Sequence, residues 1–260
     1  MRSTGQGAGL EIGTIPAEDI EATIERQFGI ARAYAWPEVA KVLALYYAPM
    51  VLLLAVGAAW LLVDQEGLRQ VLLGTADEAS TAAVVASVVS LPGTLLALAY
   101  IALRNRLHGM TWASLGVRKA PLGRSLKYMF GFLALAVMAV LGLVAVMVAL
   151  QVPEPEMAVR PARSASTWIW LLVGAVIIGP LGEELIHRGM IFGFLRHRHR
   201  VVIAALISSV IFALLHLSPV AFVTALPLGL YLCLMYQRLG SIVPGLVLHM
   251  SWNLLVSLAG

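Results

Sequence analysis

Charged residues are scarce in this chain, and that scarcity excludes an ordinary soluble domain. Only 12% of its 260 residues are Asp, Glu, Lys or Arg, about half the share that soluble globular proteins contain. Hydrophobic residues make up 60%, and the mean hydropathy is +0.88. The apolar residues form long runs without the polar alternation of barrel strands, so the runs favour membrane-spanning helices. The sequence therefore predicts an all-α fold, a polytopic transmembrane helical bundle.

Cysteine is nearly absent as well, and so is any long apolar run near the start. The single cysteine, Cys233, lies inside an apolar run, which excludes an internal disulfide and predicts a small buried side chain. Residues 1–42 lack the apolar core and the cleavage site of a secretory signal peptide. We expect them to form a polar cytoplasmic tail with an amphipathic helix from Ala17 to Ala33.

Basic residues exceed acidic ones, giving a net charge of +4, but their placement does not favour nucleic-acid binding. They flank the apolar runs, where lipid headgroups and membrane topology explain them. With the N-terminus in the cytoplasm, 14 of the 18 Lys and Arg residues fall on the cytoplasmic side and three on the opposite side, with Arg188 inside the membrane. We predict an integral multi-pass protein with a cytoplasmic N-terminus and a C-terminus on the opposite side. Its partners would include the lipid bilayer and no nucleic acid.

The apolar runs divide the chain into about seven predicted spans. The fourth span contains Pro180, which removes a backbone hydrogen bond and predicts a kink just before the most polar stretch. The predicted spans are 43–63, 80–103, 126–150, 167–195, 201–217, 220–237 and 241–258.

Two acidic residues stand out because they lie inside a predicted span. Twelve of the 14 Asp and Glu residues are in the tail or the loops, and the other two are Glu183 and Glu184 in the fourth span. An ionisable group at membrane depth costs several kcal/mol unless it is paired or hydrated, so these carboxylates are candidate functional groups. Arg188 follows Glu184 by four residues, which predicts an ion pair along the helix. Glu183 is left without that partner.

Two later spans also carry polar residues. His216 ends the FALLH segment of the fifth span, and His249 and Asn253 share a helix face in the HMSWN segment of the seventh. At about 1.5 Å per residue, these three side chains and Glu183 should all lie near the middle of the ~30 Å hydrocarbon core. We therefore expect them to share one water-filled cavity.

Three short motifs follow one another in order on successive predicted helices. GEELIHR fits E-E-x-x-x-R, FALLH fits F-x-x-x-H, and HMSWN fits H-x-x-x-N. This order resembles the CPBP family of intramembrane proteases, which includes CAAX-processing endopeptidases, bacteriocin-processing proteins and Abi proteins. Pro180, Gly189 and the basic WASLGVRK loop are also similar to that family. We divide the chain into a tail (1–42), a first span with its loop (43–79) and a CPBP-like protease core (80–260).

The resemblance implies hydrolysis of peptide bonds within or beside the membrane by a kinked catalytic helix. Glu183 and His216 would hold and deprotonate the attacking water. His249 and Asn253 would donate hydrogen bonds to the oxyanion, and the adjacent ion pair would orient the site. The substrate would be a peptide or protein at the membrane, and a prenylated CAAX protein is one option.

Several alternatives stay open at the level of sequence. Glu183, His216 and His249 would also form a His₂Glu set suited to catalytic zinc, although we favour a mechanism without a cofactor because no H-E-x-x-H segment is present. His187 stands where the family usually has an apolar or aromatic residue, and its imidazole would offer another ligand. The polar core would also suit a non-catalytic scaffold or immunity protein, or a transporter.

Overall fold

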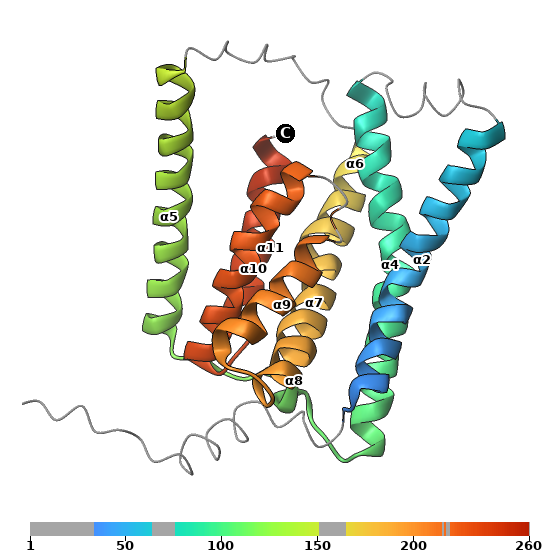
Figure 1. The fold of residues 1–260 in the computed structure, drawn as a ribbon, viewed down its shortest axis with the longest axis vertical. Coiled ribbons are helices and arrows are strands. Elements are labelled where there is room, and N and C mark those ends of the chain that lie inside the picture. Colours follow the sequence, from blue (N-terminus) through green and yellow to red (C-terminus); the bar gives the residue numbers. More distant parts are fainter. Residues whose placement is uncertain (1–33, 64–75, 151–164, 215, 217–218, 260) are drawn as a thin grey trace, which may run out of the picture.

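The computed structural model describes residues 34–63, 76–150, 165–214, 216 and 219–259, and the regular elements in these ranges are all helical. The predicted helix Ala17–Ala33 lies outside the described residues. Figure 1 shows the long helices side by side, roughly along the vertical axis of the view. In chain order, the elements outside the central helix are α2 (Trp36–Val63), α4 (Ala76–Leu107), η2 (Trp112–Leu115), α5 (Leu122–Ala149), α9 (Val201–Leu214), α10 (Pro219–Leu239) and α11 (Val243–Ala259).

The central helix is continuous from Ala165 to Arg196 but changes its type along its length. The stretch before Pro180 and the stretch after Glu183 are π-helical, whereas an α-helical turn containing both residues separates them. The irregularity expected from the proline therefore takes the form of wide turns on both sides of the short α-helical turn that contains Pro180 and Glu183. The five segments are α6 (Ala165–Trp170), η3 (Leu171–Ile178), α7 (Gly179–Glu183), η4 (Glu184–Phe192) and α8 (Gly193–Arg196).

Each of the seven predicted spans coincides with one long helix, counting the central helix as one. Among the described residues, three segments are long and apolar enough to cross a membrane: Leu122–Gly142, Trp168–Arg196 and Phe222–Leu239. Helix α9 has 14 residues, which at ~1.5 Å each is shorter than a ~30 Å hydrocarbon core. The all-helical fold with apolar membrane-type helices is thus confirmed, and seven crossings stay a prediction.

Helix α4 packs against both α2 and the central helix. These helices approach each other closely because small residues lie where they cross. A Cβ atom added at Gly93 of α4 would collide with the backbone carbonyl of Tyr46 on α2, and one added at Gly182 of α7 would collide with the Thr94 side chain. Helix α2 is thereby held beside the acidic part of the central helix.

The central helix forms the core of the bundle. All nine residues of η4 are buried, including three that are polar or charged. By contrast, α5 stands apart from the other helices in Figure 1, and very little of its apolar surface is buried. Such a surface suits contact with lipid chains.

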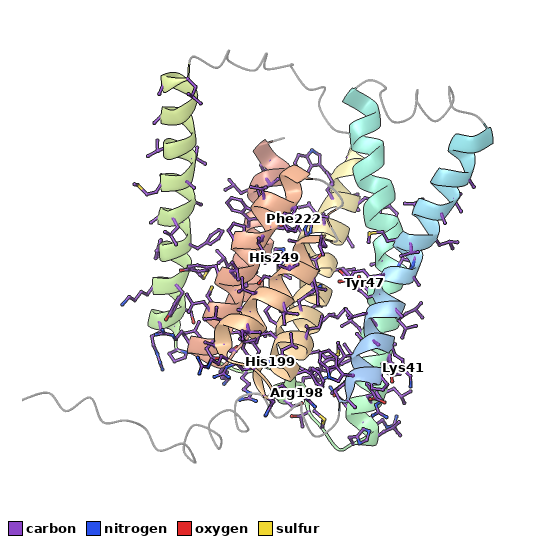
Figure 2. All side chains as sticks on the ribbon, in the orientation of Figure 1. Lys41, Tyr47, Arg198, His199, Phe222 and His249 are labelled. Carbon is purple, nitrogen blue, oxygen red and sulfur yellow. The ribbon has the colours of Figure 1, made fainter. Side chains whose placement is uncertain are left out.

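Some basic side chains lie towards one end of the bundle, away from the level of the buried acidic residues. Figure 2 shows Lys41, Arg198 and His199 towards the lower end, and Tyr47 and His249 near mid-height. The lower end is also the one where α8 connects to α9 in Figure 1. The predicted cytoplasmic location of this end, and of the N-terminus, stays a prediction.

Candidate active site

The ion pair predicted within the fourth span is present and buried. Arg188 Nη1 donates to Glu184 Oε1 at 2.8 Å, and both side chains are only 1% exposed. The guanidinium carbon of Arg188 also lies 4.3 Å from the centre of the Phe212 ring, a cation–π arrangement. The pair therefore connects the central helix to α9 in a setting from which water is excluded.

His249 joins the last helix to both glutamates. Its Nδ1 lies 3.0 Å from Glu184 Oε1, and its Nε2 lies 3.5 Å from Glu183 Oε2. Only the shorter contact is a hydrogen bond, in which Nδ1 donates to the Glu184 carboxylate, while Nε2 faces the Glu183 carboxylate at the longer distance.

Glu183 is the more accessible of the two acids. Its side chain is 21% exposed, and its Oε1 accepts from the Tyr46 hydroxyl at 3.5 Å. The sequence left Glu183 without a partner, whereas the structure supplies contacts from two other helices, α2 and α11. These contacts hold its carboxylate at the edge of a pocket.

This pocket has a volume of about 120 Å³, enough for a few water molecules at ~30 Å³ each. Glu183 and His216 both line it, whereas His249 and Asn253, which the sequence placed in the same cavity, do not. The complete lining is Tyr46, Tyr47, Met50, Glu183, His187, Phe212 and His216.

His216 lies just beyond the end of its helix and not within it. Helix α9 ends at Leu214, and His216 is in a turn whose backbone N–H donates to Ala213 O. The His216 Nδ1 lies 3.1 Å from the Phe212 carbonyl oxygen, which can only accept, so Nδ1 bears the hydrogen. A neutral ring then presents Nε2 as an acceptor. The predicted span 201–217, whose ends the sequence gives to within a few residues, thus extends past α9, which ends two residues before the histidine.

Asn253 does not line the pocket. Its Nδ2 donates to the Ala175 carbonyl oxygen at 2.8 Å. This carbonyl belongs to the π-helical segment η3, where the backbone hydrogen bonds are shifted from the α-helical pattern. In this conformation, Asn253 holds α11 against the central helix one turn away from His249.

Comparison with known proteins identifies the segment that contains these groups. Residues 165–255 match the family described as type II CAAX prenyl endopeptidase Rce1-like. This match supports a CPBP-type CAAX protease family for that segment. The matched segment contains all six predicted site residues, and it begins at α6. No curated protein and no solved structure matches the chain.

Two site residues lie outside the CPBP segment and were missed by sequence reasoning. They are Tyr46 and Tyr47 of α2, which line the pocket together with Met50. Neither tyrosine belongs to a CPBP motif. The only signal was the pair of adjacent phenols within an apolar run of the first span, which also suits ordinary helix packing. The separation of 137 residues between Tyr46 and Glu183 gave no means of pairing them.

His187, which departs from the usual CPBP pattern, is fully buried in the pocket wall. Its Nε2 lies 2.8 Å from the Tyr47 hydroxyl, and its Nδ1 lies 2.9 Å from the Glu183 carbonyl oxygen. Both ring nitrogens therefore have partners from the protein. His187 is placed to support the backbone beside Glu183.

The alternative zinc set of Glu183, His216 and His249 is not assembled. In the described ranges, no group of three His, Cys, Asp or Glu side chains is placed to hold a metal ion. The reason lies in His249, because each of its ring nitrogens faces a carboxylate of the central helix. These residues, as arranged, do not fit a His₂Glu zinc centre.

Proposed function

We propose that the protein is an intramembrane endopeptidase that hydrolyses peptide bonds in membrane-associated substrates with a water activated by Glu183 and His216. The observation that supports this most strongly is the pocket that both side chains line. An ionisable residue inside a membrane bundle is costly unless it has partners or a function. Here Glu183 is partly exposed beside a small pocket that His216 also lines, while its neighbour Glu184 is buried against Arg188.

The two groups suit a water bound between them. A carboxylate accepts one hydrogen of that water, and the Nε2 of His216 accepts the other, which directs an oxygen lone pair at a substrate carbonyl carbon. As the oxygen–carbon bond forms, the water proton moves to Glu183. Glu183 then returns this proton to the leaving amine when the carbon–nitrogen bond breaks.

The negative charge that develops on the carbonyl oxygen needs donors. We retain His249 and Asn253 for this role. Asn253 has a second N–H besides the one that donates to Ala175. For His249, the Nε2 atom would have to turn from its long 3.5 Å contact with Glu183 Oε2 to the oxyanion when substrate binds, while Nδ1 stays on Glu184. Each such donor is worth roughly 3 kcal/mol in acyl-transfer enzymes. Glu184 and Arg188 contribute by fixing the helix that presents Glu183.

The substrate class follows from the membrane setting and the Rce1-like family. We propose a protein or peptide at the membrane, with a prenylated CAAX sequence as the first candidate. Cleavage of the peptide bond and a requirement for the prenyl group on the substrate are separate properties. Both are tested by comparing a farnesylated and an unprenylated peptide of the same CAAX sequence.

The deciding experiment uses full-length wild-type protein and the Glu183→Gln variant. Purified protein is incubated with the two peptides, and products are identified by mass spectrometry. In parallel, terminal peptides are compared between membranes that contain either form. We expect new termini with wild type and none with Glu183→Gln. Equal products from both forms, or no product from wild type in either assay, would refute the proposed protease activity.

A further inference from the structure

We propose that Tyr46 and Tyr47 of α2 are positioning residues that hold Glu183 at two points, its carboxylate and its backbone carbonyl. This inference rests on the proposed function, because it assigns a task to residues around the same base. Helix α2 lies outside the family match at 165–255. Figure 2 shows Tyr47 between α2 and the central helix, near the level of His249.

The contact with the backbone passes through His187. A carbonyl oxygen can only accept, so the His187 Nδ1, 2.9 Å from Glu183 O, bears the hydrogen. In the neutral ring, Nε2 is then an acceptor, and the Tyr47 hydroxyl at 2.8 Å donates to it. The chain from Tyr47 through His187 to Glu183 is thus fixed in direction and selects one tautomer of the imidazole.

This chain reaches the helix at the position where its geometry changes. Glu183 is the last residue of α7, and the π-helical segment η4 begins at Glu184. A π-helix shifts backbone hydrogen bonds from the fourth to the fifth residue. The side chain of His187, four residues after Glu183, bonds to the Glu183 carbonyl at this transition. Tyr47 therefore acts on the orientation of the base through the backbone.

The contact with the carboxylate is direct. The Tyr46 hydroxyl donates to Glu183 Oε1 at 3.5 Å, and Thr94 of α4 is a second hydrogen-bond partner of that hydroxyl. Since Glu183 Oε2 lies beside His249 Nε2, the carboxylate is held from α2 on one side and from α11 on the other. Hydrogen bonds of this kind are often long in the absence of substrate and shorten in the reactive complex.

The two phenols also contact each other. Their ring centres are 4.7 Å apart at 78°, an edge-to-face arrangement, and the Tyr46 ring lies 6.0 Å from the His187 ring. Removing one hydroxyl leaves this aromatic packing in place. The Tyr→Phe changes therefore separate hydrogen bonding from packing.

A third tyrosine supplies the matched control. Tyr34, just before α2, donates from its hydroxyl to Asn105 Oδ1 at 3.3 Å and so attaches the start of α2 to α4. It is buried like Tyr46 but does not line the pocket. If the tyrosines only attach α2 to its neighbours, Tyr34→Phe should reduce activity as much as Tyr46→Phe or Tyr47→Phe.

The experiment measures cleavage of the farnesylated CAAX peptide by full-length protein in detergent, together with the melting temperature of each variant. We expect Tyr46→Phe and Tyr47→Phe each to lower kcat about tenfold or more, since small displacements of a catalytic group are costly. KM should stay within about twofold, and Tyr34→Phe should keep a kcat near that of wild type. Unchanged kcat in both pocket variants, or an equal loss in Tyr34→Phe, would overturn the inference.

A double-mutant cycle tests the chain through His187. If Tyr47 acts through His187, then Tyr47→Phe combined with His187→Leu should lower kcat no more than the more damaging single change. Losses that multiply would show that the two residues act independently, against the proposed chain. Glu183→Gln is included in the same assay. If it stays active, the proposed function fails; if it is inactive while the pocket tyrosine variants match wild type, only the positioning role fails.

Discussion

The Nδ1 atom of His249 lies 3.0 Å from the Oε1 atom of Glu184, although the two residues are 65 positions apart in the sequence. The same oxygen accepts from Arg188 at 2.8 Å. Glu184 is therefore the point at which the central helix and α11 are joined. The two adjacent glutamates therefore have different surroundings, because Glu184 is buried beside Arg188 and His249 while Glu183 faces the pocket.

His216→Ala should lower kcat/KM by at least about 100-fold, a loss typical of removing a group that assists proton transfer. In the proposed mechanism, Nε2 of this ring is the second acceptor for the attacking water. The protein should remain folded and inserted, because His216 is exposed. Peptide cleavage and the melting temperature provide the measurements, and exposed His199→Ala is the control. Activity within tenfold of wild type would count against the assigned water site.

Arg188→Ala should reduce stability as well as activity. It leaves Glu184 as a buried carboxylate without its guanidinium partner, which can cost about 3–5 kcal/mol. We expect lower expression and a lower melting temperature, measured beside Arg198→Ala, whose cation is at the exposed end of the central helix. An Arg188→Ala protein with wild-type stability would show that the ion pair is not needed to hold the fold.

Gly189→Ala should destabilise the protein because a Cβ atom there would lie 2.7 Å from the Leu115 carbonyl oxygen. The backbone of η2 would have to move away from the central helix. Gly142→Ala in α5 is the control, since a Cβ at that position meets nothing within 4 Å, and alanine is the better helix former by about 1 kcal/mol. The melting temperature should therefore fall for Gly189→Ala and either rise or stay unchanged for Gly142→Ala. Equal melting temperatures would contradict the close packing.

Metal analysis should find well below one zinc per chain in active protein. Prolonged treatment with o-phenanthroline or EDTA should leave peptide cleavage intact, since Glu183 and His216 activate water directly in the proposed mechanism. His249→Asn should keep partial activity, because an amide can still donate a hydrogen bond. About one metal per chain, with activity that disappears on its removal and returns with added Zn²⁺, would refute this mechanism.

Contacts within one helix could be predicted from the sequence, whereas contacts between distant helices could not. The pair Glu184–Arg188 follows from four-residue spacing, and the structure confirms it. The burial of Cys233, predicted from its place inside an apolar run, is also confirmed. Tyr46 and Tyr47 were missed because helix periodicity says which residues share a face and not which distant helix that face meets.

The end of α9 and the π-helical segments also could not be predicted from the sequence. Apolar periodicity continues through His216, so nothing in the pattern marked Leu214 as the last helical residue. Pro180 indicated an irregular helix but not its form, because a missing backbone donor is compatible with a bend as well as with wider turns. The tertiary contact of Asn253 with Ala175 and the local contact of His187 with Glu183 both involve the backbone at or beside the wide turns.

The wide turns of the central helix determine the direction in which the side chains after them point around the helix axis. A π-helical turn holds more residues than an α-helical one, and each residue of an α-helix advances the side-chain direction by about 100°. Deleting one residue from Leu171–Ile178 would therefore turn Glu183 away from Tyr46 and His249 even though every motif letter stayed the same. Transplanting the E-E-x-x-x-R motif onto a regular α-helix would therefore reproduce its residues but not the orientation of their side chains.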